Sequence, residues 1–143
     1  DLGGVQRARV LADRLGTSIA IIEKRRPEPG KAEVMNFIGD VKGKNVIIVD
    51  DIIDTAGTLA KAADLMMNQG ALSVRAIITH PVLSGPAYDR IMNSKLTTLY
   101  VTDTIPLKKP CPKIEVLSVA ELFADVIKKV YNNQSISSSS YLK

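Results

Sequence analysis

The residues best suited to chemistry are carboxylates and threonines that directly follow one apolar segment. Residues 45–49 read Asn-Val-Ile-Ile-Val, and residues 50–58 continue Asp-Asp-Ile-Ile-Asp-Thr-Ala-Gly-Thr. Small residues let a backbone approach an anion closely, and the N–H groups at the start of a following helix attract phosphate. Carboxylates repel phosphate but suit sugar hydroxyls or the ligand shell of Mg²⁺. The pattern therefore predicts a loop that binds a sugar phosphate.

The expected roles within this loop divide by residue type. Asp50 and Asp51 are the carboxylates available for hydroxyl groups or a cation. The phosphate is expected against the residues that follow: Asp54, Thr55, Ala56, Gly57 and Thr58. The chain has no G-x-x-x-x-G-K-[ST] motif, which excludes a Walker-type nucleotide loop. The alternative is a plain strand–turn–helix junction whose acids and threonines only cap the helix. Two adjacent acids, a third acid and T-A-G-T make that interpretation the weaker one.

Apolar periodicity and turn residues predict the elements that must position this loop. Ser118 is expected to cap the last helix. The inward face of that helix is expected to carry Leu122, Val126, Ile127 and Val130. We expect helices near residues 5–15, 58–69, 85–92 and 118–130, and strands near 18–22, 33–38, 45–50, 74–79, 96–101 and 114–117. Residues 23–32 are charged and rich in proline and glycine, which is typical of a long loop.

Strands that alternate with helices, and that are nearly all apolar, indicate an α/β fold with a parallel sheet covered by helices on both faces. In such sheets ligands bind beyond the carboxyl ends of the strands, where residues 50–58 are expected to lie. We expect one domain over residues 1–131 and a loose polar tail over residues 132–143. The chain begins at Asp1 without a methionine or a signal-peptide pattern, so we expect it to be a piece of a longer protein.

Composition narrows the class of partner. No apolar stretch approaches the roughly 20 residues that span a bilayer, so no membrane partner is expected. A single cysteine, Cys111, fits a reducing compartment and a cytoplasmic location. The net charge is +4, but aromatic residues make up only 4% of the chain and do not interleave with the basic ones, which argues against nucleic acid. The basic residues gather at 24–26, Lys31, Lys42 and Lys44, which favours a small polyanionic ligand.

The loop and three other stretches resemble a known family. Residues 49–58 resemble the phosphoribosyl-pyrophosphate (PRPP) loop shared by type I phosphoribosyltransferases and ribose-phosphate pyrophosphokinases. Residues 1–9, Asp-Leu-Gly-Gly-Val-Gln-Arg-Ala-Arg, are similar to a segment of the pyrophosphokinases, and residues 22–27, Ile-Glu-Lys-Arg-Arg-Pro, to their catalytic flexible loop. Residues 79–87 and 102–106 match later segments of the same family in order and spacing.

The resemblance implies a phosphoribosyltransferase-like, three-layer domain that is the C-terminal one of two. It implies transfer of the pyrophosphoryl group of Mg-ATP to the C1 hydroxyl of ribose 5-phosphate, giving PRPP and AMP. Residues 54–58 would bind the 5-phosphate, and Asp50 and Asp51 the ribose hydroxyls. Lys24 and Arg26 would close over the transferring group, and Asp1 would help to hold Mg²⁺.

The resemblance also implies homo-oligomers and a regulatory site. Most ATP contacts of the family lie in its N-terminal half, so the 143 residues alone are expected to be inactive. Ser135 and Ser137 match a family segment that helps to form an allosteric phosphate or ADP site between subunits, and a disordered tail is the alternative there. Two other functions stay open: a type I phosphoribosyltransferase that consumes PRPP, and a regulatory relative that has lost the chemistry.

Overall fold

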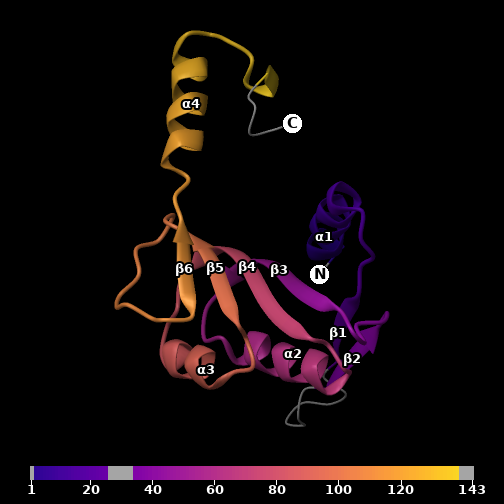
Figure 1. The fold of residues 1–143 in the computed structure, drawn as a ribbon. Helices are drawn as coiled ribbons and strands as arrows, with labels where there is room; N and C mark the ends of the chain where they lie inside the picture. Colours follow the sequence, from indigo (N-terminus) through magenta and orange to yellow (C-terminus); the bar gives the residue numbers. More distant parts are fainter. Residues whose placement is uncertain (1, 26–33, 139–143) are drawn as a thin grey trace.

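A four-stranded parallel sheet forms the centre of the molecule in the computed structural model, which describes residues 2–25 and 34–138 (Figure 1). Its strands follow one another in the order β3-β4-β5-β6. They are β3 (Asn45–Ile53), β4 (Ser73–Pro81), β5 (Thr98–Thr102) and β6 (Ile114–Leu117). The expected α/β class with a parallel sheet flanked by helices is confirmed.

One face of this sheet carries most of the hydrophobic core. Side chains alternate between the two faces of a strand, so every second residue of β4 and β5 points to the same side. On this side the fully buried strand residues are Val74, Ala76, Ile78, Leu99 and Val101. They pack against α2 (Gly57–Asn68) and α3 (Ala87–Asn93), which lie together beneath the sheet in Figure 1. The helix α2 directly follows β3, so this packing fixes where the β3–α2 loop lies.

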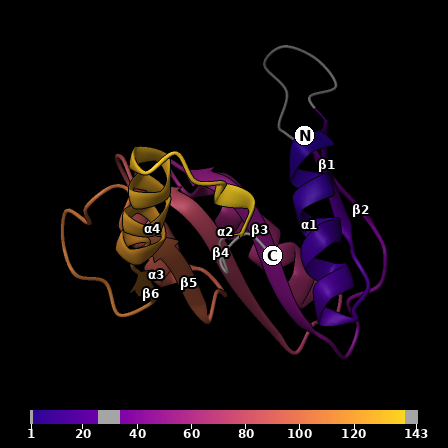
Figure 2. The same ribbon diagram turned by 90° about the horizontal axis from the view of Figure 1, so that it is seen from above.

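The opposite face is covered only in part. The helix α1 (Leu2–Leu15) lies beside β3 in both views of the chain (Figure 1, Figure 2). Ile47 of β3 and Ile77 of β4 keep 45% and 39% of their surface exposed. The three-layer arrangement predicted from the sequence is therefore filled on the α2 and α3 side and sparse on the α1 side.

The segment that precedes the expected flexible loop forms a different strand from the predicted one. A buried strand was predicted at residues 18–22, but the strand β1 spans Ile21–Arg25 and its described residues are only half-buried. It pairs antiparallel with β2 (Val34–Ile38) in a separate two-stranded sheet, with Arg25 opposite Val34. Pairing with β2 carries the strand into the segment predicted as loop, and the prediction of a strand at 33–38 is confirmed for Val34–Ile38.

The strand β3 is longer than predicted. It was expected to end at Asp50, but it continues to Ile53 because residues 52 and 53 still pair with His80 and Pro81 of β4. Asp50 and Asp51 are thus part of the strand, and the loop proper is reduced to residues 54–56.

The prediction of an inward face for the last helix was wrong. The helix α4 (Ala120–Tyr131) has no buried residue, and Ile127 and Val130 are 65% and 62% exposed. Figure 1 shows that α4 projects away from the sheet beyond the end of β6, so the sheet does not cover its apolar side. Its N-cap position is held by Val119, one residue after the predicted Ser118, and the Ser118 hydroxyl accepts a hydrogen bond from the Ala120 N–H.

The described part of the tail contains one short turn of 3₁₀-helix, Ile136–Ser138. Within the described ranges, every helix is too short or too polar to cross a membrane.

Candidate functional site

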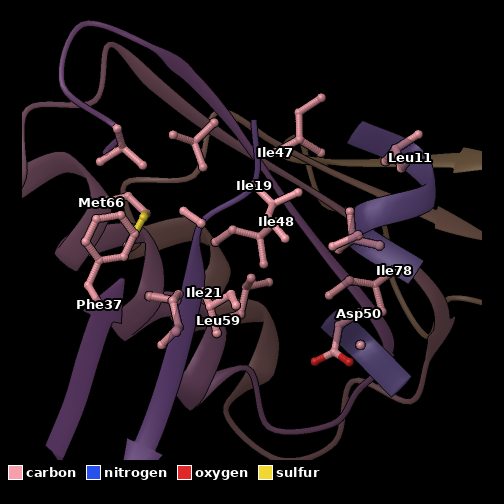
Figure 3. A pocket seen from close by; sticks show the side chains of 18 of the residues that line it. Leu11, Ile19, Ile21, Phe37, Ile47, Ile48, Asp50, Leu59, Met66 and Ile78 are labelled. Carbon is pink, nitrogen blue, oxygen red and sulfur yellow. The ribbon is translucent and has the colours of Figure 1, made fainter. Parts of the chain in front are cut away.

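The β3–α2 loop borders a cavity of about 770 Å³ between α1, β1, β3 and α2. Residues 54–58 line it together with Asp50, as do many apolar side chains from α1 and β3. Figure 3 shows the Asp50 carboxylate at one end of this cavity, among labelled side chains that are otherwise apolar. The structure therefore brings a carboxylate and the predicted phosphate loop to one hollow.

The loop is held from one side by the segment that follows β4. The Ile53 carbonyl accepts hydrogen bonds from the N–H groups of Val82 (3.0 Å) and Leu83 (3.2 Å). The Asp54 carbonyl accepts one from the Ser84 N–H at 3.1 Å, and the Ser84 hydroxyl donates to the Asp54 carboxylate. Because a trans peptide directs its N–H opposite to its carbonyl, the N–H groups that follow these carbonyls point away from the β4–α3 segment.

The backbone at Ala56 has an unusual conformation. Its φ is 60° and its ψ is 7°, in the left-handed region that costs residues other than glycine about 1–2 kcal/mol. Successive N–H groups around a left-handed residue form concave sites that bind anions. Within the loop it is Ala56 that adopts this left-handed conformation, whereas Gly57 has no positive φ.

The N-cap residue of α2 offers no side-chain cap. Ala56 occupies the N-cap position and makes no side-chain hydrogen bond there. The N–H groups and the positive end of the dipole at the start of a helix favour an anion there. This geometry fits the predicted sugar-phosphate loop better than the alternative of a loop whose acids and threonines cap the helix.

The two adjacent carboxylates have different partners. The Asp50 carboxylate accepts a hydrogen bond of 2.9 Å from the Asp51 N–H, whereas the Asp51 carboxylate pairs with the Arg7 guanidinium of α1 at 3.2 Å. A hydrogen bond with the Asp50 side chain, and secondly the charge of Arg7, lower the pKa of Asp51 below its usual 3.8. Asp51 is therefore ionised at neutral pH and can accept hydrogen bonds from hydroxyl groups.

The carboxylates fit a Mg²⁺ ion only as part of a shared shell. Among the residues that the structure describes, no three acidic, histidine or cysteine side chains gather closely enough to hold a metal. Mg²⁺ usually takes one or two protein carboxylates and completes its shell with water and substrate phosphates. Asp50 has the right chemistry for such a partial shell, and the predicted ligand Asp1 lies outside the described residues.

The remaining predicted site residues belong to other elements or lie outside the described chain. Lys24 is on β1 opposite Met35 of β2, and Arg26 lies outside the described residues. Ser135 and Ser137 are both exposed in the tail, with their hydroxyl oxygens 2.7 Å apart.

Sequence reasoning missed three side chains that support the loop. Arg7 pairs with Asp51, Ser84 binds Asp54, and the Nη1 of Arg90 donates a hydrogen bond of 3.0 Å to the Thr55 carbonyl. Each is more than 25 residues from its partner in the sequence. Only the resemblance at residues 1–9 and 79–87 indicated that the segments around Arg7 and Ser84 matter, and nothing singled out Arg90.

Comparison with known proteins gives this geometry a family. The model of the phosphoribosyl synthetase-associated domain matches residues 23–142. The chain belongs to this family. The match includes the β3–α2 loop, the β4–α3 segment that holds it and the tail.

Relatives of this phosphoribosyl synthetase-associated domain carry a common name. A ribose-phosphate pyrophosphokinase of Campylobacter jejuni is 58% identical over 138 residues, and one of Wolinella succinogenes is 56% identical over 138 residues. Each alignment covers 96% of this chain and 45% of the relative. The crystal structure of phosphoribosylpyrophosphate synthetase from Mycobacterium smegmatis is similar with a TM-score of 0.80 and 40% identity, over 89% of this chain and 42% of that one. The chain thus spans less than half the length of the relatives it matches.

Proposed function

We propose that this chain is the ribose 5-phosphate-binding domain of a two-domain ribose-phosphate pyrophosphokinase. In this reaction the C1 hydroxyl of ribose 5-phosphate attacks the β-phosphorus of Mg-ATP, and the bond from that phosphorus to the oxygen bridging to the α-phosphate breaks. The products are PRPP and AMP. The observation that carries the proposal is the uncapped β3–α2 loop beside Asp50, in a chain whose relatives at 56–58% identity bear this name.

The proposed roles follow the chemistry of the loop. Residues 54–58 hold the 5-phosphate through backbone N–H groups and threonine hydroxyls, while Asp50 and Asp51 accept hydrogen bonds from the ribose hydroxyls. A phosphoryl transfer asks the protein mainly for positioning and neutralisation of charge. Lys24 and Arg26 supply that neutralisation over the transferring group.

Mg²⁺ would be shared between the substrates and the carboxylates of Asp50 and Asp1, where it would neutralise charge on the transferring phosphates. ATP binds mainly to the other domain of the intact enzyme. The proposal includes residues 1–131 as one domain, residues 132–143 as its tail, a cytoplasmic location and a homo-oligomer. Ser135 and Ser137 are proposed to contribute to a phosphate or ADP effector site between subunits.

The ligand half of this proposal can be tested on the 143 residues. Titration of the ¹⁵N-labelled chain with ribose 5-phosphate is expected to shift the amide resonances of residues 54–58, with weak affinity and no turnover. Ribose without phosphate serves as the matched ligand control and should shift them far less. Tight binding of ATP by this chain, or ribose 5-phosphate shifts confined to other residues, contradicts the proposal.

The reaction itself is tested in the intact enzyme. Incubation with labelled ATP and ribose 5-phosphate should release AMP, and Lys24→Ala should lower kcat by about 10²–10³ with little change in ribose 5-phosphate affinity. Lys95→Ala, which removes an exposed charge of the same sign outside the basic group that contains Lys24, should leave both values close to wild type. Absence of AMP from the intact wild-type protein would overturn the assignment.

A further inference from the structure

Arg90 of α3 reaches the β3–α2 loop from a position 35 residues away in the sequence. Its Nη1 donates a hydrogen bond of 3.0 Å to the Thr55 carbonyl oxygen. The same atom lies 3.1 Å from the place where a Cβ on Gly57 would stand. We propose that Arg90 is a positioning residue, which turns the Thr55–Ala56 peptide so that the Ala56 N–H meets the phosphate of ribose 5-phosphate. This inference rests on the proposed function of the loop.

The direction of the Ala56 N–H follows from the planarity of the peptide group. In a trans peptide the carbonyl and the N–H point in opposite directions, so a carbonyl fixed by Arg90 directs the next N–H away from α3. The two preceding carbonyls, of Ile53 and Asp54, are already held from the same β4–α3 segment. Arg90 thus extends the arrangement to a third successive peptide, so the N–H groups of residues 54 and 55 face away from the β4–α3 segment and that of Ala56 faces away from α3.

The charge of Arg90 adds to its geometry. A hydrogen bond from a charged donor is stronger than one between neutral groups, and it polarises the peptide that receives it. The N–H of that peptide, on Ala56, becomes a better donor to an anion. Ala56 also requires a stabilising contact from outside the loop, because its left-handed backbone is unfavourable for a residue with a Cβ.

The guanidinium also gives a physical reason for glycine at position 57. A Cβ at Gly57 would come within 3.1 Å of the Arg90 Nη1 and 3.6 Å of its Cζ. The open side of Gly57 therefore leaves room for Arg90 to approach without being pushed aside. Gly57→Ala is expected to displace the guanidinium. It would then weaken the hydrogen bond to the Thr55 carbonyl that Arg90→Ala removes.

The first test uses the free protein and needs no ligand. In the ¹⁵N-labelled chain, Arg90→Ala is expected to move the Ala56 amide resonance and to change its HN–Hα coupling, which reports φ. Arg90→Lys keeps the charge and should produce a smaller change, which decides the matter if Arg90→Ala fails to fold. Lys61→Ala, on the exposed side of α2, is the matched loss of charge and should leave Ala56 unchanged. An unchanged Ala56 amide and coupling in Arg90→Ala overturns the inference.

The second test measures ribose 5-phosphate affinity in the same variants. Arg90→Ala should weaken binding about 10–100-fold, as expected for the loss of a hydrogen bond from a charged group. Arg90→Lys should recover part of that loss, and Lys61→Ala should stay within about twofold of wild type. Gly57→Ala combined with Arg90→Ala should cost little more than either change alone, because both act on one peptide.

The two proposals fail in different ways. If wild type binds ribose 5-phosphate through the loop and Arg90→Ala binds it equally well, the role of Arg90 is wrong and the proposed function stands. If wild type does not bind ribose 5-phosphate, the proposed function is wrong. The first test still decides whether Arg90 fixes the orientation of the Thr55–Ala56 peptide. A loss of affinity with no change at Ala56 makes Arg90 a direct ligand contact and overturns the positioning role.

Discussion

Two strand–helix junctions of the same parallel sheet, β3–α2 and β6–α4, treat the start of their helices in opposite ways. At β6–α4 the chain supplies its own anion: the Asp103 carboxylate accepts a hydrogen bond from the Val119 N–H at 2.9 Å. The Ser118 hydroxyl donates to the same carboxylate and accepts from the Ala120 N–H. At β3–α2 the N-cap residue Ala56 makes no side-chain hydrogen bond, and the supporting bonds go to carbonyls on the side of the β4–α3 segment.

The difference teaches how one junction becomes a binding site. Both follow the carboxyl end of a parallel strand, where ligands bind in such sheets. We call the β6–α4 junction closed, because a carboxylate of the chain satisfies the first N–H groups and no external anion is needed. We call the β3–α2 junction open, because its carbonyls are fixed while its N-cap residue makes no side-chain bond, an arrangement that suits an external anion. The helices differ as well, because α2 is packed under the sheet while α4 projects from it.

The largest expected effect tests this difference in packing. Met66 of α2 is 2% exposed, and Met66→Ala should lower the free energy of unfolding by about 2–5 kcal/mol. Ile127 of α4 is 65% exposed, and Ile127→Ala should change it by no more than about 0.5 kcal/mol. Urea unfolding of the 143-residue chain measures both values. Equal losses in the two variants would mean that α4 is packed in solution.

A second prediction concerns the left-handed residue at the open junction. Ala56→Val places a β-branched side chain at φ 60°, and it should weaken ribose 5-phosphate binding about tenfold or more because the left-handed conformation is lost. Ala56→Gly removes the Cβ penalty and should bind at least as well as wild type. Val119→Ala at the closed junction is the matched control. Calorimetric titration with ribose 5-phosphate separates the three, and equal affinity of Ala56→Val and wild type would contradict the role of this backbone.

The comparison also shows which parts of the site a sequence can reveal. The loop could be predicted because its acids, threonines and small residues are contiguous. Arg90 could not, because its contact depends on how α3 packs beneath the sheet. The apolar side of α4 was recognised and its burial was wrongly assumed, because periodicity shows that a face is apolar and not what covers it. The antiparallel pairing of β1 with β2 was missed for the same reason, since the apolar run of β1 does not specify its partner strand.

A third prediction uses the acid sensitivity of the closed junction. A hydrogen bond from the Ser118 hydroxyl, and secondly one from the Val119 N–H, lower the pKa of Asp103 below 3.8. A lowered folded-state pKa means that these bonds stabilise the junction above about pH 4 and are lost as the pH falls through the folded value. The Val119 amide resonance should therefore titrate with a midpoint below 3.8. In Asp103→Asn this titration should vanish, and a midpoint above 3.8 would contradict the hydrogen bonds.

The smallest expected effects come from the two serines that serve the junctions in different roles. Ser84 binds the Asp54 side chain behind the open junction, and Ser118 binds Asp103 and the first turn of α4 at the closed one. Each hydroxyl donates one hydrogen bond to a solvent-exposed carboxylate, so the contribution of each is expected to be small. Ser84→Ala should weaken ribose 5-phosphate binding by up to about tenfold and leave the Val119 amide in place. Ser118→Ala should shift the Val119 amide and raise the pKa of Asp103, with no change in ribose 5-phosphate affinity. Each variant loses one hydrogen bond that its hydroxyl donates, so the comparison is tested by which junction responds and not by how large the response is. A loss of ligand affinity in Ser118→Ala would show that the two junctions are not independent.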